Sequence, residues 1–179
     1  GHDGTRGDRN SPTVYNAAIH FAQFWDGRAK DVEEQALGPL LNPIEHGMKN
    51  KKSVMKALKE KGYVDEFKMA FKGEKRAFSF RNIGRAIGAF ERTLLTPSDF
   101  DDYLNGDMSA LSYREKVGLK KFIVKGCVTC HSGQGVGGSM YQKLGLVEEY
   151  ETEDLGRFNV TKDVADKHYF KVPGLRNIT

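Results

Sequence analysis

One short motif limits what this chain can be more than any other feature of its sequence. Cys127 and Cys130 are its only two cysteines, they stand three positions apart, and His131 follows directly. Thiols at this spacing suit the two vinyl groups on one edge of a porphyrin, and a histidine beside them suits the iron. The motif therefore predicts one covalently attached haem c, with Cys127 and Cys130 as attachment residues and His131 as the proximal iron ligand.

Other uses of a paired-cysteine motif fit the surrounding sequence less well. A redox dithiol is typical of a βαβ unit, and no alternating strand pattern is sustained here. A zinc site needs a second pair of ligands at short spacing, which His168 alone does not supply. Residues 133–138 match the dinucleotide pattern GxGxxG, but they follow the cysteine motif instead of a strand. We therefore interpret them as a loop at the haem edge.

The composition is that of a globular protein, with 29% charged and 39% apolar residues. No run approaches the ~18–20 apolar residues of a spanning helix, so we expect no membrane span. The net charge of +4 comes from basic residues scattered among acidic ones. This pattern disfavours nucleic-acid binding and suits the docking of an acidic protein partner.

The ends of the chain suggest a piece of a longer protein. The first thirteen residues have no charged start followed by an apolar core, so no secretory signal is expected there. There is no initiator Met at the start, and the chain stops abruptly at Thr179.

Helical periodicity dominates after an N-terminal segment rich in Gly, Pro and Asn. We expect helices at residues 53–62, 64–73, 79–95 and 112–126, with serines as N-caps and Glu115 completing a capping box. A break at Pro97 begins a polar stretch that is the expected domain junction. The predicted fold class is mostly α-helical with large loops.

The sixth ligand of the predicted haem is not apparent. Small c-type cytochromes usually take a methionine well downstream of the proximal histidine. Met140 follows His131 too closely, and the other methionines lie upstream. We expect this ligand beyond Thr179.

Several short segments along the chain resemble segments of a known protein family. They are residues 10–17 (NSPTVYNA), 23–29 (QFWDGRA), 42–45 (NPIE), 89–94 (AFERTL), 127–131 (CVTCH), 137–139 (GGS) and 172–177 (VPGLRN). In this order they resemble the bacterial dihaem cytochrome c peroxidase family over nearly the whole chain. The resemblance implies two cytochrome c-like haem domains, here residues 1–96, with the peroxide-reacting haem, and residues 97–179, with the electron-receiving haem.

The resemblance also implies roles for particular residues. His2 matches the removable distal ligand of the peroxidatic haem, and Glu45 matches the acid/base residue above that haem. Trp25 matches a tryptophan between the two haems, where it would act as a catalytic electron bridge. Asn10 matches a calcium ligand at the domain interface. The motif at Cys127–His131 matches the electron-receiving haem.

The implied protein is a periplasmic peroxidase with two haems c and calcium. It would reduce hydrogen peroxide to water with electrons from a monohaem cytochrome c or a copper protein, and such proteins often form homodimers. This chain departs from the family in having one CxxCH motif instead of two. We expect the other shortly before His2.

Two alternatives stay open from the sequence. A related dihaem oxidase that acts on a protein substrate would share the fold and differ in the sixth ligand of the second haem. A non-enzymatic monohaem electron-transfer cytochrome would need only the motif at residues 127–131. The sequence offers no partner for the remaining histidines, His20, His46 and His168.

Overall fold

N-caps and apolar residues at helical spacing determine most of the regular structure. In the computed structural model, which describes residues 1–178, the helices are α1 (Val32–Gln35), α2 (Leu37–Leu41), α3 (Lys51–Glu60), α4 (Val64–Ala70), α5 (Phe80–Glu91), α6 (Asp99–Leu104), α7 (Tyr113–Val124) and α8 (Phe158–Thr161). Short 3-10 turns occupy Ala17–Ile19, Cys127–Thr129 and Val164–Asp166. The prediction of a mainly helical chain with large loops is confirmed.

The helix boundaries follow capping chemistry, with two corrections to the sequence prediction. Asn50, and not Ser53, caps α3, and Ser53 completes the capping box from inside the first turn. Helix α5 begins after Ser79 as expected but ends at Glu91, before the expected Leu95. The predicted capping box of Ser112 and Glu115 is confirmed at the start of α7.

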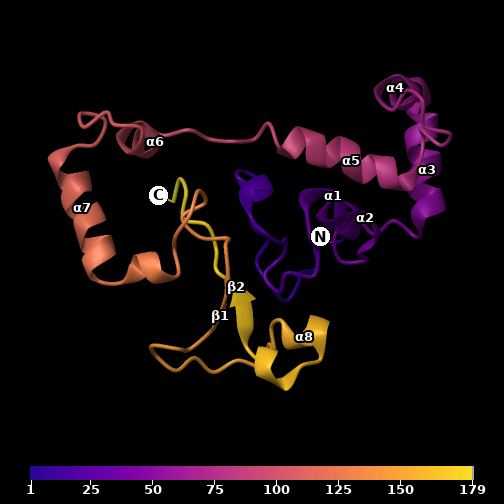
Figure 1. Cartoon of the computed structure of the whole chain (residues 1–179). Helices are drawn as coiled ribbons and strands as arrows, with labels where there is room; N and C mark the ends of the chain where they lie inside the picture. The colour runs from indigo at the N-terminus through magenta and orange to yellow at the C-terminus, as the bar shows by residue number, and fades with distance from the viewer. Residues whose placement is uncertain (179) are drawn as a thin grey trace.

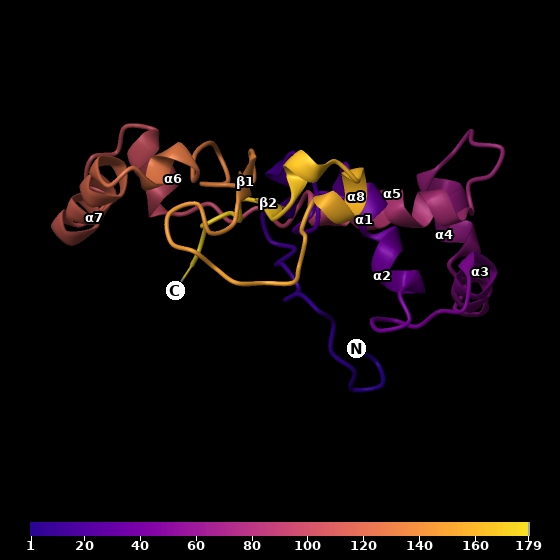
Figure 2. The ribbon, with the colours of Figure 1, turned by 90° about the horizontal axis from the view of Figure 1, so that it is seen from below.

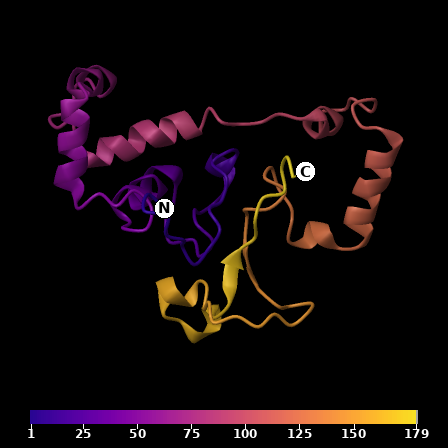
Figure 3. The same cartoon turned by 180° about the vertical axis from the view of Figure 1, so that it is seen from behind.

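Helices α1 to α5 enclose the main apolar core. Val54, Phe67 and Ile83 are buried at its centre, one each from α3, α4 and α5. Figure 1 shows these helices at one end of the molecule and α7 at the other, with an extended segment between α5 and α6. The views from below and from behind show the same separation (Figures 2 and 3). No residue of α7 is buried.

A small antiparallel sheet was not expected from the sequence. Strand β1 (Tyr141–Lys143) pairs with β2 (Tyr169–Lys171), so that Tyr141 lies opposite Lys171 and Lys143 opposite Tyr169. Strands of three residues are too short to show an alternating apolar pattern. The sheet joins the loop after the cysteine motif to the end of the chain.

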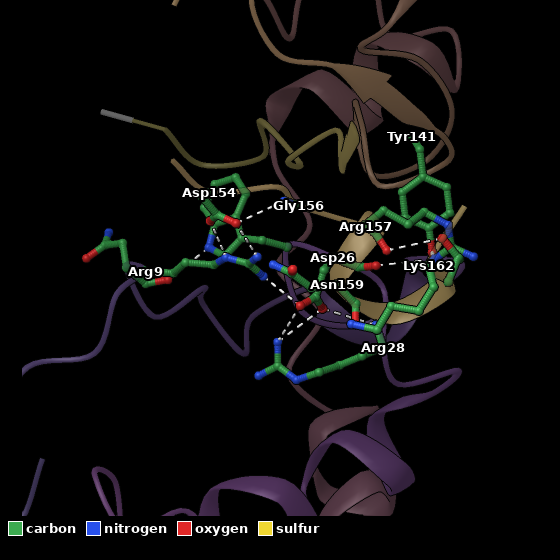
Figure 4. A network of polar contacts seen from close by, with 12 residues as sticks. Arg9, Asp26, Arg28, Tyr141, Asp154, Gly156, Arg157, Asn159 and Lys162 are labelled. Carbon is green, nitrogen blue, oxygen red and sulfur yellow. Dashed lines mark hydrogen bonds and ion pairs between the residues drawn. The ribbon is translucent and has the colours of Figure 1, made fainter. Parts of the chain in front are cut away.

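Charged side chains connect the N-terminal segment to the C-terminal one. Arg9 donates to both carboxylate oxygens of Asp154, at 2.6 and 2.7 Å, and to Asp26 at 2.6 Å. Arg157 donates to the backbone oxygen of Asp26 and to the Tyr141 hydroxyl. Figure 4 shows this network. The contacts cross the expected division at residues 96 and 97, which falls in the segment between α5 and α6 and stays a prediction.

Among residues 1–178, no helix is both long and apolar enough to cross a membrane.

The contact between α5 and α1 depends on glycine. A Cβ atom at Gly84 would lie 2.4 Å from the backbone oxygen of Glu33, and one at Gly88 would lie 2.7 Å from the Glu33 side chain. The two glycines are four residues apart on α5, which places them on one face. They let the two helix backbones approach closely.

Gly84→Ala should therefore lower the free energy of unfolding by about 2 kcal/mol, because a backbone oxygen has to move to admit the methyl group. The measurement is urea denaturation followed by circular dichroism. Gly118→Ala is the matched control, since it is also helical and its Cβ would meet nothing within 4 Å. The control should be neutral or stabilising by up to about 1 kcal/mol. Equal stability of the two variants would contradict the packing argument.

Candidate haem site

The cysteine motif follows directly from the end of α7. The helix ends at Val124, and Gly126, two residues later, adopts a positive φ of 82°, a conformation that favours glycine. A 3-10 turn at Cys127–Thr129 comes next, and the amide of His131 donates to the backbone oxygen of Cys127 at 2.9 Å. Both cysteines are free thiols, Cys127 exposed and Cys130 half-buried. The turn thus offers two unpaired thiols beside an imidazole.

The His131 imidazole is not held in the way of a structural histidine. Its Nδ1 atom is buried and has no hydrogen-bonding partner among residues 1–178. Its ring centroid lies 6.4 Å from that of Phe122 on α7. Buried polar atoms are normally paired, so an unpartnered one indicates a functional position. Two free thiols and this imidazole are the donor set of a c-type haem, and they fit that group.

A cavity of about 680 Å³ adjoins the motif. Cys130 and His131 line it from one side, and Asn10 and Trp25 line it from the N-terminal segment. Strand β2 and residues 142–150 supply further walls. The volume falls within the range of roughly 300–1,000 Å³ typical of small-molecule and cofactor sites. The structure therefore brings four of the residues singled out from the sequence to one cavity.

Trp25 is fixed at this cavity through its side chain and its backbone. Its indole Nε1 donates to the backbone oxygen of Asn10 at 2.8 Å. Its own backbone oxygen accepts from the amide of Lys171 at 2.7 Å. The indole ring thus has one orientation relative to the wall that contains Cys130 and His131.

The preceding residue, Phe24, was missed as a site residue. It lines a second cavity of about 280 Å³, together with Arg28 and Glu45. Phe24 adopts a positive φ of 64°, which is rare for an aromatic residue and is found mainly at functional positions. The Arg28 guanidinium stacks 3.5 Å from its ring centroid. Adjacent residues, Phe24 and Trp25, therefore line the two different cavities.

His2 contacts the turn that contains Glu45 through the backbone of that turn. Glu45 is half-buried in a turn whose Asn42 side chain accepts from the amide of Ile44. The amide of His2 donates to the backbone oxygen of Glu45 at 3.0 Å, and His2 Nδ1 lies 3.2 Å from the same oxygen. The His2 side chain is 44% exposed and pairs with Asp3. It is thus held by the Glu45 turn while remaining open to solvent.

The calcium role of Asn10 has no added support from this geometry. The Asn10 side chain is exposed, and its backbone oxygen is engaged by Trp25. Residues 1–178 contain no group of three or more His, Cys, Asp or Glu side chains arranged to hold a metal ion. Calcium binding at Asn10 stays a prediction.

The structure also supplies a partner for His20. Its Nδ1 atom lies 2.9 Å from Nζ of Lys171. Burial and, to a smaller extent, the Lys171 charge lower the pKa of His20 to about 4. Burial lowers the pKa of Lys171 to about 8. No local pattern could have shown this pair, because 151 positions separate the two residues.

Comparison with curated proteins gives close relatives over nearly the whole chain. It is 45% identical over 181 residues to cytochrome c551 peroxidase of Nitrosomonas europaea, and 45% identical over 186 residues to that of Pseudomonas aeruginosa. Each alignment covers 99% of this chain, and 54% and 53% of the relatives respectively. The chain therefore spans about half the length of these relatives.

Comparison with solved structures also finds a similar fold over nearly the whole chain. A MauG-like protein associated with microbial copper homeostasis matches with a TM-score of 0.81 at 27% identity, over 99% of this chain and 57% of that one. The family model described as di-haem cytochrome c peroxidase matches residues 1–109, which include Asn10, Trp25 and Glu45. The chain therefore belongs to the di-haem cytochrome c peroxidase family.

Proposed function

We propose that this chain is part of a periplasmic dihaem peroxidase that reduces hydrogen peroxide to water. The balance is one peroxide, two electrons and two protons to two waters, with the electrons delivered by a small redox protein such as a monohaem cytochrome c or a copper protein. The observation that carries the proposal is the placement of Trp25 and Phe24 on two cavities, one with Cys130 and His131 and the other with Glu45. The 45% identity to two cytochrome c551 peroxidases supports it.

In this proposal the haem c groups supply redox-active iron, and the chain supplies attachment, proton transfer and orientation. Cys127 and Cys130 hold the electron-receiving haem, and His131 ligates its iron. Glu45 moves a proton between the two peroxide oxygens, which requires a carboxylate within hydrogen-bond reach of the substrate. Trp25, which lines the cavity with Cys130 and His131, would serve as the electron bridge between the two haems.

His2 is the proposed gate of the peroxidatic site. As an iron ligand in one state, the His2 imidazole would block the substrate position, and its release would open that position. Its contacts are to the backbone oxygen of Glu45 and to exposed Asp3. A shift of the Glu45 turn would therefore move both residues together, which is a change in population between two arrangements.

The proposal also includes the domain division, the calcium site, the cellular location and the oligomeric state. Residues 1–96 and 97–179 would form two haem domains, with calcium at their interface near Asn10. Attachment of haem c outside the bacterial cytoplasm supports a periplasmic location. A homodimer is expected from the family.

Haem counting tests the proposal directly. The full-length gene product should contain two haems per chain by pyridine haemochrome assay. A Cys127→Ala/Cys130→Ala variant should contain one, because covalent attachment needs these thiols. A wild-type count of one would favour the electron-transfer cytochrome over the enzyme. An unchanged count in the double variant would contradict the assignment of the motif.

Glu45→Gln should lower kcat for peroxide by about 100-fold or more at unchanged haem content, since a positioned acid/base group contributes roughly 10²–10⁴. The measurement is steady-state oxidation of a reduced donor protein. His46→Gln is the control, because His46 is the exposed neighbour in the same turn. Wild-type turnover in the Glu45 variant would remove its proton-transfer role.

A further inference from the structure

Lys171 is an unusual residue for its position. It ends strand β2 and is 7% exposed, and it lines the same cavity as Cys130 and His131. Lysines are almost never fully buried unless their charge is paired. The environment of its ammonium group is therefore informative.

Among residues 1–178, the polar side-chain contact of this ammonium is with His20 alone. Because the pKa of His20 is lowered to about 4, the imidazole is neutral near pH 7 and its Nδ1 accepts from Lys171. Lys171, with a pKa of about 8, is mostly protonated there. The pair thus carries one positive charge and no negative one.

No carboxylate among residues 1–178 lies within 4.0 Å of the Lys171 ammonium. Arg9, which lines the same cavity, differs in this respect, because Asp26 and Asp154 neutralise it. A buried charge is costly unless it is paired and hydrogen-bonded. Lys171, a residue of the cavity wall, therefore carries a buried cation that no protein carboxylate compensates.

We propose that the Lys171 ammonium binds a propionate carboxylate of the haem attached at Cys127 and Cys130. Haem propionates are anions, and this haem would occupy the cavity that Lys171 lines. The inference rests on the proposed haem attachment and deepens it. His20 is a positioning residue, since its neutral Nδ1 holds the ammonium while leaving N–H donors for the carboxylate.

Lys171 also holds the backbone of Trp25 in place. Its backbone amide donates to the Trp25 carbonyl at 2.7 Å, and the residue lines the same cavity as Trp25. Binding a propionate through this residue would set the haem edge beside Trp25. The nearby positive charge would also favour the reduced haem, which carries one positive charge fewer.

The test is Lys171→Met in the full-length holoprotein, which keeps the apolar stem and removes the charge. The equilibrium constant for reduction of this haem should fall about tenfold, equivalent to 59 mV for one electron. The propionate bending mode in the resonance Raman spectrum should shift as well. Lys171→Arg keeps a cation and should restore both. Lys143→Met is the matched control, because Lys143 lies on the paired strand at the same cavity but is exposed.

The outcomes separate this inference from the proposed function. If the wild-type protein carries no haem at Cys127 and Cys130, the haem assignment itself fails. If haem is present and Lys171→Met leaves the potential and the Raman mode unchanged, only the lysine proposal fails. If Lys171→Met does not fold, a crystal structure of the wild-type holoprotein tests the contact between Lys171 and the propionate directly. An Nζ–propionate distance of about 2.7–2.9 Å would support the proposal, and a separation beyond hydrogen-bond distance, or a protein carboxylate in that place, would overturn it.

Discussion

The Arg9 guanidinium is the contact on which the arrangement of the site depends. It forms a two-pronged pair with Asp154 and a third bond to Asp26, so it joins three segments that are remote in sequence. This pairing holds the pKa of the Asp154 carboxyl below its usual range. A half-buried two-pronged pair gives geometric specificity more than net stability. Asp26 follows Trp25 directly, so the position of the indole depends on it.

The orientation of residues 24 and 25 follows from these contacts. The Asp26 carboxylate also accepts from Arg28, whose guanidinium stacks on Phe24. Strand β2 holds the other side of Trp25 through its backbone oxygen. One dipeptide, constrained from both sides, therefore places one aromatic ring on each cavity. In the proposed function, such a fixed dipeptide would help to keep the two haems at a constant separation.

Local sequence signals predicted the four longer helices, α3, α4, α5 and α7, but neither the four shorter helices nor the strands. The capping box of Ser112 and Glu115 located the start of α7 because both partners lie within one turn. The predicted N-cap of α3, Ser53, was wrong. Asn50 is the N-cap, and both residues take part in the capping box, so the pattern fits either one. Strands β1 and β2 are defined by their pairing with each other, and three residues contain no readable period. The left-handed backbone conformation of Phe24 likewise could not be predicted from the sequence.

By itself the sequence predicted haem attachment at Cys127, Cys130 and His131, because these residues lie within five consecutive positions and act as one local unit. It also predicted roles for Glu45, Trp25 and His2 through the resemblance to the family. Only the tertiary structure decided which of these residues share a cavity, and it alone revealed the Lys171–His20 pair. The physical reason is that the protonation and the pairing of a buried charged group depend on the residues that surround it. Its neighbours come from distant parts of the chain and leave no pattern along it.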